Sequence, residues 1–136
     1  MNEFQGNAAR DGEHYRGVCC EALERFGFEI VHGKGLRVAD CGVDVDIVAR
    51  NRHGLEFLIE CKGGYGRGKK PGGLLSSDNV RKAIGSAYCL SRSESHTGAP
   101  FTPLLVMTTY MTNHRSVNFD QLLSLIHISE PTRLRR

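Results

Sequence analysis

The chain has 136 residues, of which 40% are hydrophobic and 24% charged, as in an ordinary globular domain with a single core. No stretch approaches the roughly 18 apolar residues of a membrane span and no signal peptide opens the chain, so we expect a cytoplasmic protein without a membrane partner. The net charge of +3 favours no class of partner, because the last twelve residues hold three Arg and one Glu and so supply +2 of it.

The N-terminal half predicts one helix and three strands. Residues 11–26 place six apolar side chains on one helical stripe, and Gly27 ends it. "FEIV" (28–31) predicts a short strand, followed by a glycine-rich loop over 32–42. The runs 43–49 and 55–62 predict a β-hairpin, with Gly54 where a three-residue loop needs a positive φ. The helical stripe consists of Tyr15, Val18, Cys19, Ala22, Leu23 and Phe26.

The second half continues with a helix and a strand. A flexible loop over 63–73 precedes a helix over 76–92, and residues 103–111 predict a buried strand. "NFDQLLSLI" (118–126) begins a further helix. The order α-β-β-β-α-β predicts a single α/β domain over residues 1–124, with a mixed central sheet flanked by helices. Val80, Ala83, Ile84, Ala87 and Tyr88 form the apolar stripe of the second helix.

The C-terminal tail is a separate matter. "LIHISEPTR" resembles the translation of a sequencing adapter, so we interpret residues 125–136 as a non-native tail and expect the native domain to be truncated there. The alternative is a natural helix end over 122–128 that Pro131 breaks.

Two common site types are excluded by spacing. The cysteines at 19, 20, 41, 61 and 89 are odd in number and lack C-x-x-C pairs, so neither a disulfide framework nor a zinc ribbon is predicted. The segment from Gly63 to Lys69 is nearly the G-x-x-x-x-G-K of a phosphate-binding loop. Lys70 replaces the hydroxyl residue that would hold magnesium, and Pro71 follows where a helix should begin, so nucleotide hydrolysis is not predicted.

The hairpin instead brings carboxylates together. Side chains alternate along a strand, so Glu60 and Lys62 share one face and Cys61 points to the other. A three-residue loop places Asp46 opposite Glu60, whereas a five-residue loop places Asp44 there. Either pair leaves two carboxylates about 5 Å apart, which destabilises a sheet unless a cation lies between them. Oxygen ligands of this kind suit Mg²⁺ or Mn²⁺. The alternative is a solvated sheet face with incidental acids.

At this point "GVDVDIVARNRHGLEFLIECKGG" resembles the signature of the PD-(D/E)XK nuclease superfamily, over roughly residues 10–110. Thirteen residues separate Asp46 from Glu60, and Lys62 stands at the lysine of the motif. Val45 occupies the position of the proline. The resemblance implies a restriction endonuclease-like fold.

The resemblance also implies roles for individual residues. Asp46, Glu60 and the backbone carbonyl of Cys61 would hold Mg²⁺, or alternatively Mn²⁺. Lys62 would orient or deprotonate the attacking water, or stabilise the charged phosphate as a fixed cation. Glu13 would be the glutamate that the family often carries on its first helix, with Glu21 and Glu24 as alternatives.

A basic flank completes the expected site. Arg67, Lys69 and Lys70 would contact the nucleic-acid backbone, and Lys82 or Asn79 would supply the additional polar residue found after the motif. The three loop residues can equally form a solvated basic linker, and a surface lysine is the favoured interpretation of Lys82.

The sequence therefore predicts a metal-dependent DNA endonuclease. The alternative is a catalytically inactive nucleic-acid-binding module on the same fold, and a protein-interaction domain is disfavoured because such a domain gains nothing from an acid pair. Cleavage of both strands of a duplex would be compatible with a homodimer.

Overall fold

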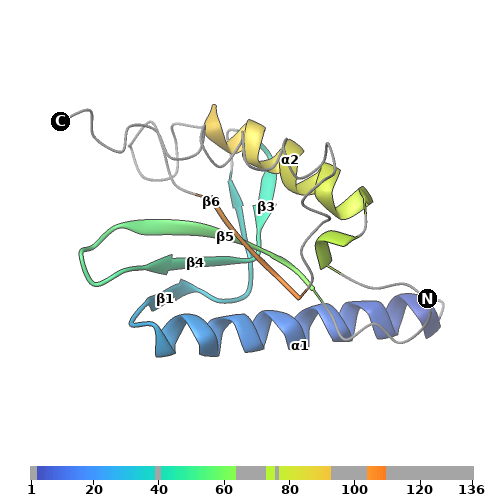
Figure 1. The fold of residues 1–136 in the computed structure, drawn as a ribbon, viewed down its shortest axis with the longest axis horizontal. Helices are drawn as coiled ribbons and strands as arrows, with labels where there is room; N and C mark the ends of the chain where they lie inside the picture. Colours follow the sequence, from blue (N-terminus) through green and yellow to red (C-terminus); the bar gives the residue numbers. More distant parts are fainter. Residues whose placement is uncertain (1–2, 39–40, 64–72, 76, 93–103, 110–136) are drawn as a thin grey trace.

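The computed structural model describes residues 3–38, 41–63, 73–75, 77–92 and 104–109, with side chains from residue 10 onward (Figure 1). Within these ranges lies a mixed four-stranded sheet of order β1-β4-β5-β6 and a separate two-stranded sheet, β2-β3. The α/β class and the mixed sheet are thus confirmed. The elements are α1 (Glu3–Arg25), β1 (Glu29–His32), β2 (Leu36–Val38), β3 (Val43–Val45), β4 (Ile47–Arg50), β5 (Glu56–Lys62), the 3₁₀ turn η1 (Gly73–Leu75), α2 (Ser77–Ser91) and β6 (Leu104–Thr108).

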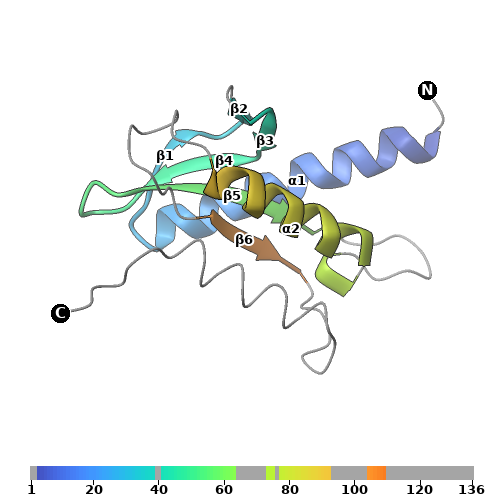
Figure 2. The same cartoon turned by 90° about the horizontal axis from the view of Figure 1, so that it is seen from above.

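The two helices cover opposite faces of the larger sheet (Figures 1 and 2). Helix α1 packs Tyr15, Cys19 and Leu23 against apolar side chains of β4 and β5 on one face. Helix α2 packs Ala87 and Leu90 on the other face, where β2 and β3 also contribute buried valines. Within the described part of the chain, no helix is long and apolar enough to cross a membrane.

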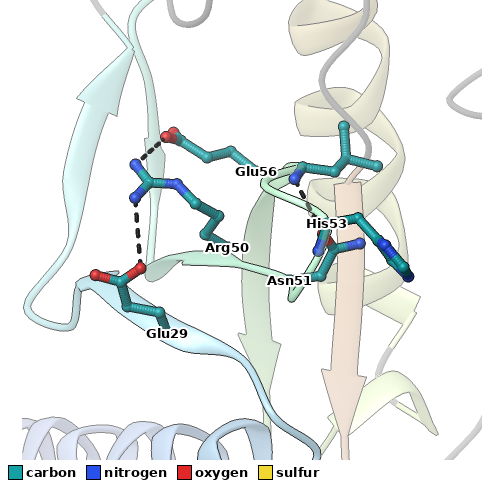
Figure 3. Close-up of polar contacts among 6 residues, drawn as sticks. Glu29, Arg50, Asn51, His53 and Glu56 are labelled. Carbon is teal, nitrogen blue, oxygen red and sulfur yellow. Dashed lines mark hydrogen bonds and ion pairs between the residues drawn. The ribbon is translucent and has the colours of Figure 1, made fainter.

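The β4–β5 hairpin adopts the three-residue loop. Asn51 N–H donates to the Leu55 carbonyl at 2.9 Å, and Gly54 has φ +81°. The ladder then pairs Ile47 with Ile59. This is the first of the two registers considered above, although the ladder itself ends at Ile47 because the chain bends at Asp46. The Asn51 side chain closes the loop by accepting backbone hydrogen bonds from the N–H groups of His53 and Leu55, each at 2.9 Å (Figure 3).

An ion-pair row crosses the sheet close to this loop. Arg50 on β4 lies between Glu29 of β1 and Glu56 of β5, at 3.4 Å and 2.8 Å (Figure 3). The three residues stand opposite one another in the two ladders, so the charges alternate across adjacent strands. Opposite charges in this arrangement stabilise strand pairing modestly.

Parallel pairing of β6 with β5 makes the sheet mixed. Its register sets Glu60 beside Val106 and Lys62 beside Thr108. Thr108 Oγ1 accepts a hydrogen bond from Leu74 N–H at 3.1 Å, which ties η1 to the end of β6.

Several boundaries and burial patterns differ from expectation. The run 43–49 is divided by a bend at Asp46 into β3 and β4, and the expected loop 32–42 contains β2. Phe26, expected on the buried stripe, is 82% exposed because α1 ends one residue before it. Tyr88 is 54% exposed, and Leu90 is buried on α2 instead. The further helix over 118–126 and the tail over 125–136 lie outside the described residues.

Candidate metal centre

Strand β5 carries the centre of the candidate site. Glu60 is 6% exposed, and it is the only charged residue buried among those described. Lys62, two residues further along the strand, forms an ion pair from its Nζ to Glu60 Oε1. The two side chains therefore lie on the same face of β5, as the two-residue period of a strand requires. Glu60 Oε2 is also buried, and it accepts no hydrogen bond from any residue in the described ranges.

Asp46 reaches the same strand from the bend between β3 and β4. Its N–H donates to the Ile59 carbonyl at 3.0 Å. Its carboxylate Oδ2 accepts a hydrogen bond from Cys61 N–H at 2.7 Å. The side chain thus takes over a ladder position that the bend leaves open, and this fixes its carboxylate beside the Glu60–Lys62 segment.

Burial dominates the electrostatics of Glu60. Loss of hydration raises the pKa of its carboxyl group, and the hydrogen bond and charge of Lys62 lower it in part. The negative charges of Asp46 and, to a smaller extent, Asp44 raise the pKa further. The two acids are therefore close enough to repel each other, and Lys62 compensates only one Glu60 oxygen.

These residues fit a hard divalent cation. An unpartnered buried carboxylate oxygen costs roughly 1–3 kcal/mol or more, and a cation at that oxygen would offset the cost. In the described ranges, no three His, Cys, Asp or Glu side chains converge on a metal position. Mg²⁺ does not need such a cage, because it is commonly held by one or two carboxylates together with waters and substrate phosphates.

The other predicted site residues lie elsewhere or outside the described ranges. Asp44 is on β3 and forms an exposed ion pair with Arg37 across the β2–β3 sheet, at 3.2 Å. Glu13 is an exposed residue of α1, the helix that covers the face of the sheet opposite to α2. Arg67, Lys69 and Lys70 fall in the segment that is not described.

Residues of α2 lie on the Glu60 side of the sheet. Lys82 is exposed and pairs with Asp78 at 2.8 Å. The hydrogen bond from Lys82 is the main cause that lowers the pKa of Asp78, and the positive charge of Lys62 lowers it by a smaller amount. The first turn of α2 is therefore within electrostatic reach of Lys62. Asn79 donates to the Gly73 carbonyl at 3.0 Å, which holds η1 against the helix.

The opposite face of β5 carries contacts that the sequence patterns did not indicate. The Cys61 thiol interacts with the thiol of Cys19 on α1, and this contact is the largest influence that lowers the pKa of Cys19. The ring of Tyr15 lies directly over Gly63, where an added Cβ would be 2.4 Å from the nearest ring atom. In the sequence, these contacts were indicated only by the position of Cys19 and Tyr15 on the apolar stripe of α1.

Comparisons of the chain with protein-family models, with curated proteins and with solved structures find no match.

Proposed function

We propose that the chain is a metal-dependent DNA endonuclease with a restriction endonuclease-like fold of the PD-(D/E)XK type. One observation carries this proposal: Glu60 has a buried oxygen without a hydrogen-bond partner in the described ranges, beside a second carboxylate and a lysine. If the Glu60–Lys62 ion pair were only structural, it would satisfy one oxygen of Glu60 and leave the other buried without a partner, which costs free energy. A bound cation would give the second oxygen a partner as well.

Asp46 and Glu60 would hold a Mg²⁺ or Mn²⁺ ion, together with the carbonyl of Cys61. The N–H and C=O groups of one strand residue point to the same side, so the hydrogen bond from Cys61 N–H to Asp46 directs that carbonyl toward Asp46. When bound, the ion would lower the pKa of a water molecule and polarise the phosphate. The Asp46–Cys61 hydrogen bond holds one carboxylate oxygen in place, and the other oxygen would be available as a ligand to the ion.

Lys62 supplies the positive charge of the proposed site. Its ammonium group is held at Glu60 Oε1 and is largely buried, with 16% of the side chain exposed. A fixed cation in a poorly hydrated site stabilises negative charge that builds up on a phosphate. Lys62 would thus orient the attacking water or bind the phosphate oxygens, and Lys82, Arg67, Lys69 and Lys70 would contact the nucleic-acid backbone.

Cleavage of supercoiled plasmid DNA with Mg²⁺, with Mn²⁺ and with EDTA tests the proposal. We expect nicked product only with a metal ion, and a loss of at least about 100-fold in rate for Glu60→Gln and for Lys62→Met, as is typical when a metal ligand or charge-stabilising group is removed. Glu56→Gln is the matched control. It makes the same change on the same strand, but at an acid that pairs with Arg50 away from the site.

The possible outcomes separate the functions. Wild-type protein that neither nicks nor binds DNA with either metal contradicts the proposal. DNA binding without cleavage supports the inactive binding module instead. Equal losses in Glu56→Gln and Glu60→Gln would show that folding, and not the site, limits the rate.

A further inference from the structure

A hollow on the surface of α1 takes no part in the candidate metal centre. Its volume is about 270 Å³, and it is lined by Val18, Glu21, Ala22, Arg25 and Phe26. Val18, Ala22 and Phe26 follow one another at intervals of four residues, so they lie in one line along the helix. The N–H of Phe26 still donates to the Ala22 carbonyl at 3.1 Å, which keeps Phe26 in this line although α1 ends at Arg25. The hollow is therefore the space that the small Ala22 leaves between two larger apolar side chains.

The ring of Phe26 stands uncovered at the edge of this hollow. It is 82% exposed, the largest exposed fraction among the large hydrophobic side chains of the described residues. Val18 and Ala22 beside it are partly exposed. Removal of such apolar surface from water favours association. A projecting ring next to a hollow with apolar walls supplies both halves of a contact between two copies of the same surface.

The two charged residues of the hollow complement each other. Glu21 and Arg25 are exposed and lie about one helical turn apart, and neither forms an ion pair with any residue in the described ranges. Their charges cancel, so this surface does not attract the phosphates of a nucleic acid. A two-fold axis across the helix reverses the order of the two residues, so that Glu21 of each copy faces Arg25 of the other. The charge pattern thus fits a second copy of this chain.

From this juxtaposition we propose that two copies of the chain associate through antiparallel α1 helices, with a two-fold axis close to Ala22. Phe26 of each copy enters the hollow of the other and contacts Val18 there. The small side chain of Ala22 at the axis lets the two helices approach closely. Two Glu21–Arg25 ion pairs form at the rim. One flank of a helix is a small interface, so the dimer is weak and its population depends on protein concentration.

Sedimentation equilibrium of the full chain tests the proposal. The measurement covers protein concentrations up to about 1 mM, which reaches weak complexes. A reductant is present, because the free cysteines of the chain could otherwise link copies covalently. We expect the average mass to rise with concentration from that of one chain toward that of two. A mass that stays at one chain over the whole range overturns the proposal. The nuclease proposal does not enter this test, because the readout is mass and not activity.

Charge reversals test the orientation of the two helices. Glu21→Arg and Arg25→Glu each replace two attractive pairs by two repulsive ones, so each should weaken self-association by about tenfold or more. An equimolar mixture of the two variants restores both attractive pairs and should form a heterodimer. Glu24→Arg is the matched control, since it makes the same change at an exposed residue of α1 outside the hollow, and it should associate like the wild type. Equal weakening in Glu24→Arg, or no recovery in the mixture, would overturn the antiparallel arrangement.

Phe26→Ser tests the hollow itself. Because the ring is largely exposed in the single chain, its removal should abolish the dimer and leave the urea unfolding of the dilute monomer unchanged. A loss of monomer stability would show that another part of the same chain covers Phe26. Undiminished association would place the interface elsewhere. Either result contradicts the proposal.

Discussion

Replacement of Gly63 by alanine is the sharpest perturbation that the structure offers. Gly63 directly follows Lys62 at the end of β5, and the ring of Tyr15 covers it. An alanine Cβ would lie 2.4, 2.6 and 2.7 Å from three ring atoms of Tyr15. Gly63 is not among the glycines with positive φ, so the conflict is one of space and not of backbone conformation.

The geometry sets the magnitude. Ordinary contact begins at 3.4 Å, so the closest ring atom must retreat by about 1 Å (3.4 − 2.4). Tyr15 is 7% exposed and packed within the core, so a retreat of its ring displaces the side chains packed around it. Insertion of a methyl group into such a packed position typically costs about 1–3 kcal/mol of unfolding free energy.

A double-mutant cycle isolates this contact. Unfolding in urea is measured for the wild type, Gly63→Ala, Tyr15→Leu and the double variant. Because Tyr15→Leu removes the ring, Gly63→Ala should cost close to nothing in that background. The coupling energy should then be about 1–3 kcal/mol, independent of what Tyr15→Leu costs alone.

The matched control is Gly85→Ala on α2. Apart from its chain neighbours and the backbone of its own helix, no atom lies within 4 Å of the added Cβ there, and the helix should gain roughly 0.5–1 kcal/mol of stability. The steric argument is refuted if Gly63→Ala costs the same in both Tyr15 backgrounds, or if it stabilises the protein as Gly85→Ala does.

Three further predictions concern the hairpin and the buried acid. The raised pKa of Glu60 means that the folded state binds its proton more tightly than the unfolded state, so its contribution to stability falls as pH rises from its ordinary pKa of 4.5 through the raised one. The stability of the wild type minus that of Glu60→Gln should therefore decrease across this interval in urea titrations, and a constant difference would contradict it. Asn51→Ala removes two hydrogen bonds to loop N–H groups and should cost about 1 kcal/mol in thermal unfolding, whereas Asn51→Asp keeps the acceptor and most of the stability. Arg50→Met removes the cation that pairs with both Glu29 and Glu56, so it should lower the melting temperature slightly. The difference from the wild type should be smaller still in about 1 M salt, because salt screens exposed ion pairs.

Local sequence patterns were sufficient to predict the centre of the sheet. The two-residue period assigned Glu60 and Lys62 to one face and Cys61 to the other, and the ion pair between Lys62 and Glu60 agrees with it. Gly54 marked the loop, since its positive φ matches the three-residue turn. The choice between the two registers also required the side chain of Asn51, whose two backbone hydrogen bonds are not evident from a hydrophobic pattern.

Features that depend on distant partners were missed. The bend at Asp46 is fixed by hydrogen bonds to Ile59 and Cys61, residues on another strand, so the alternating run around it reads as one continuous strand. Helical period identifies an apolar stripe but not how far the helix continues. Phe26 therefore fits the stripe of α1 although it lies in the turn beyond it.

The bend at Asp46 also changes how one amide proton is protected. Most N–H groups in the middle of β5 are held by neighbouring backbone strands, so they exchange with solvent deuterium only when the sheet opens. The N–H of Cys61 is held by a side-chain carboxylate instead. Its exchange rate therefore reports the orientation of a single residue, and this amide provides a spectroscopic probe of Asp46 within an otherwise slowly exchanging strand.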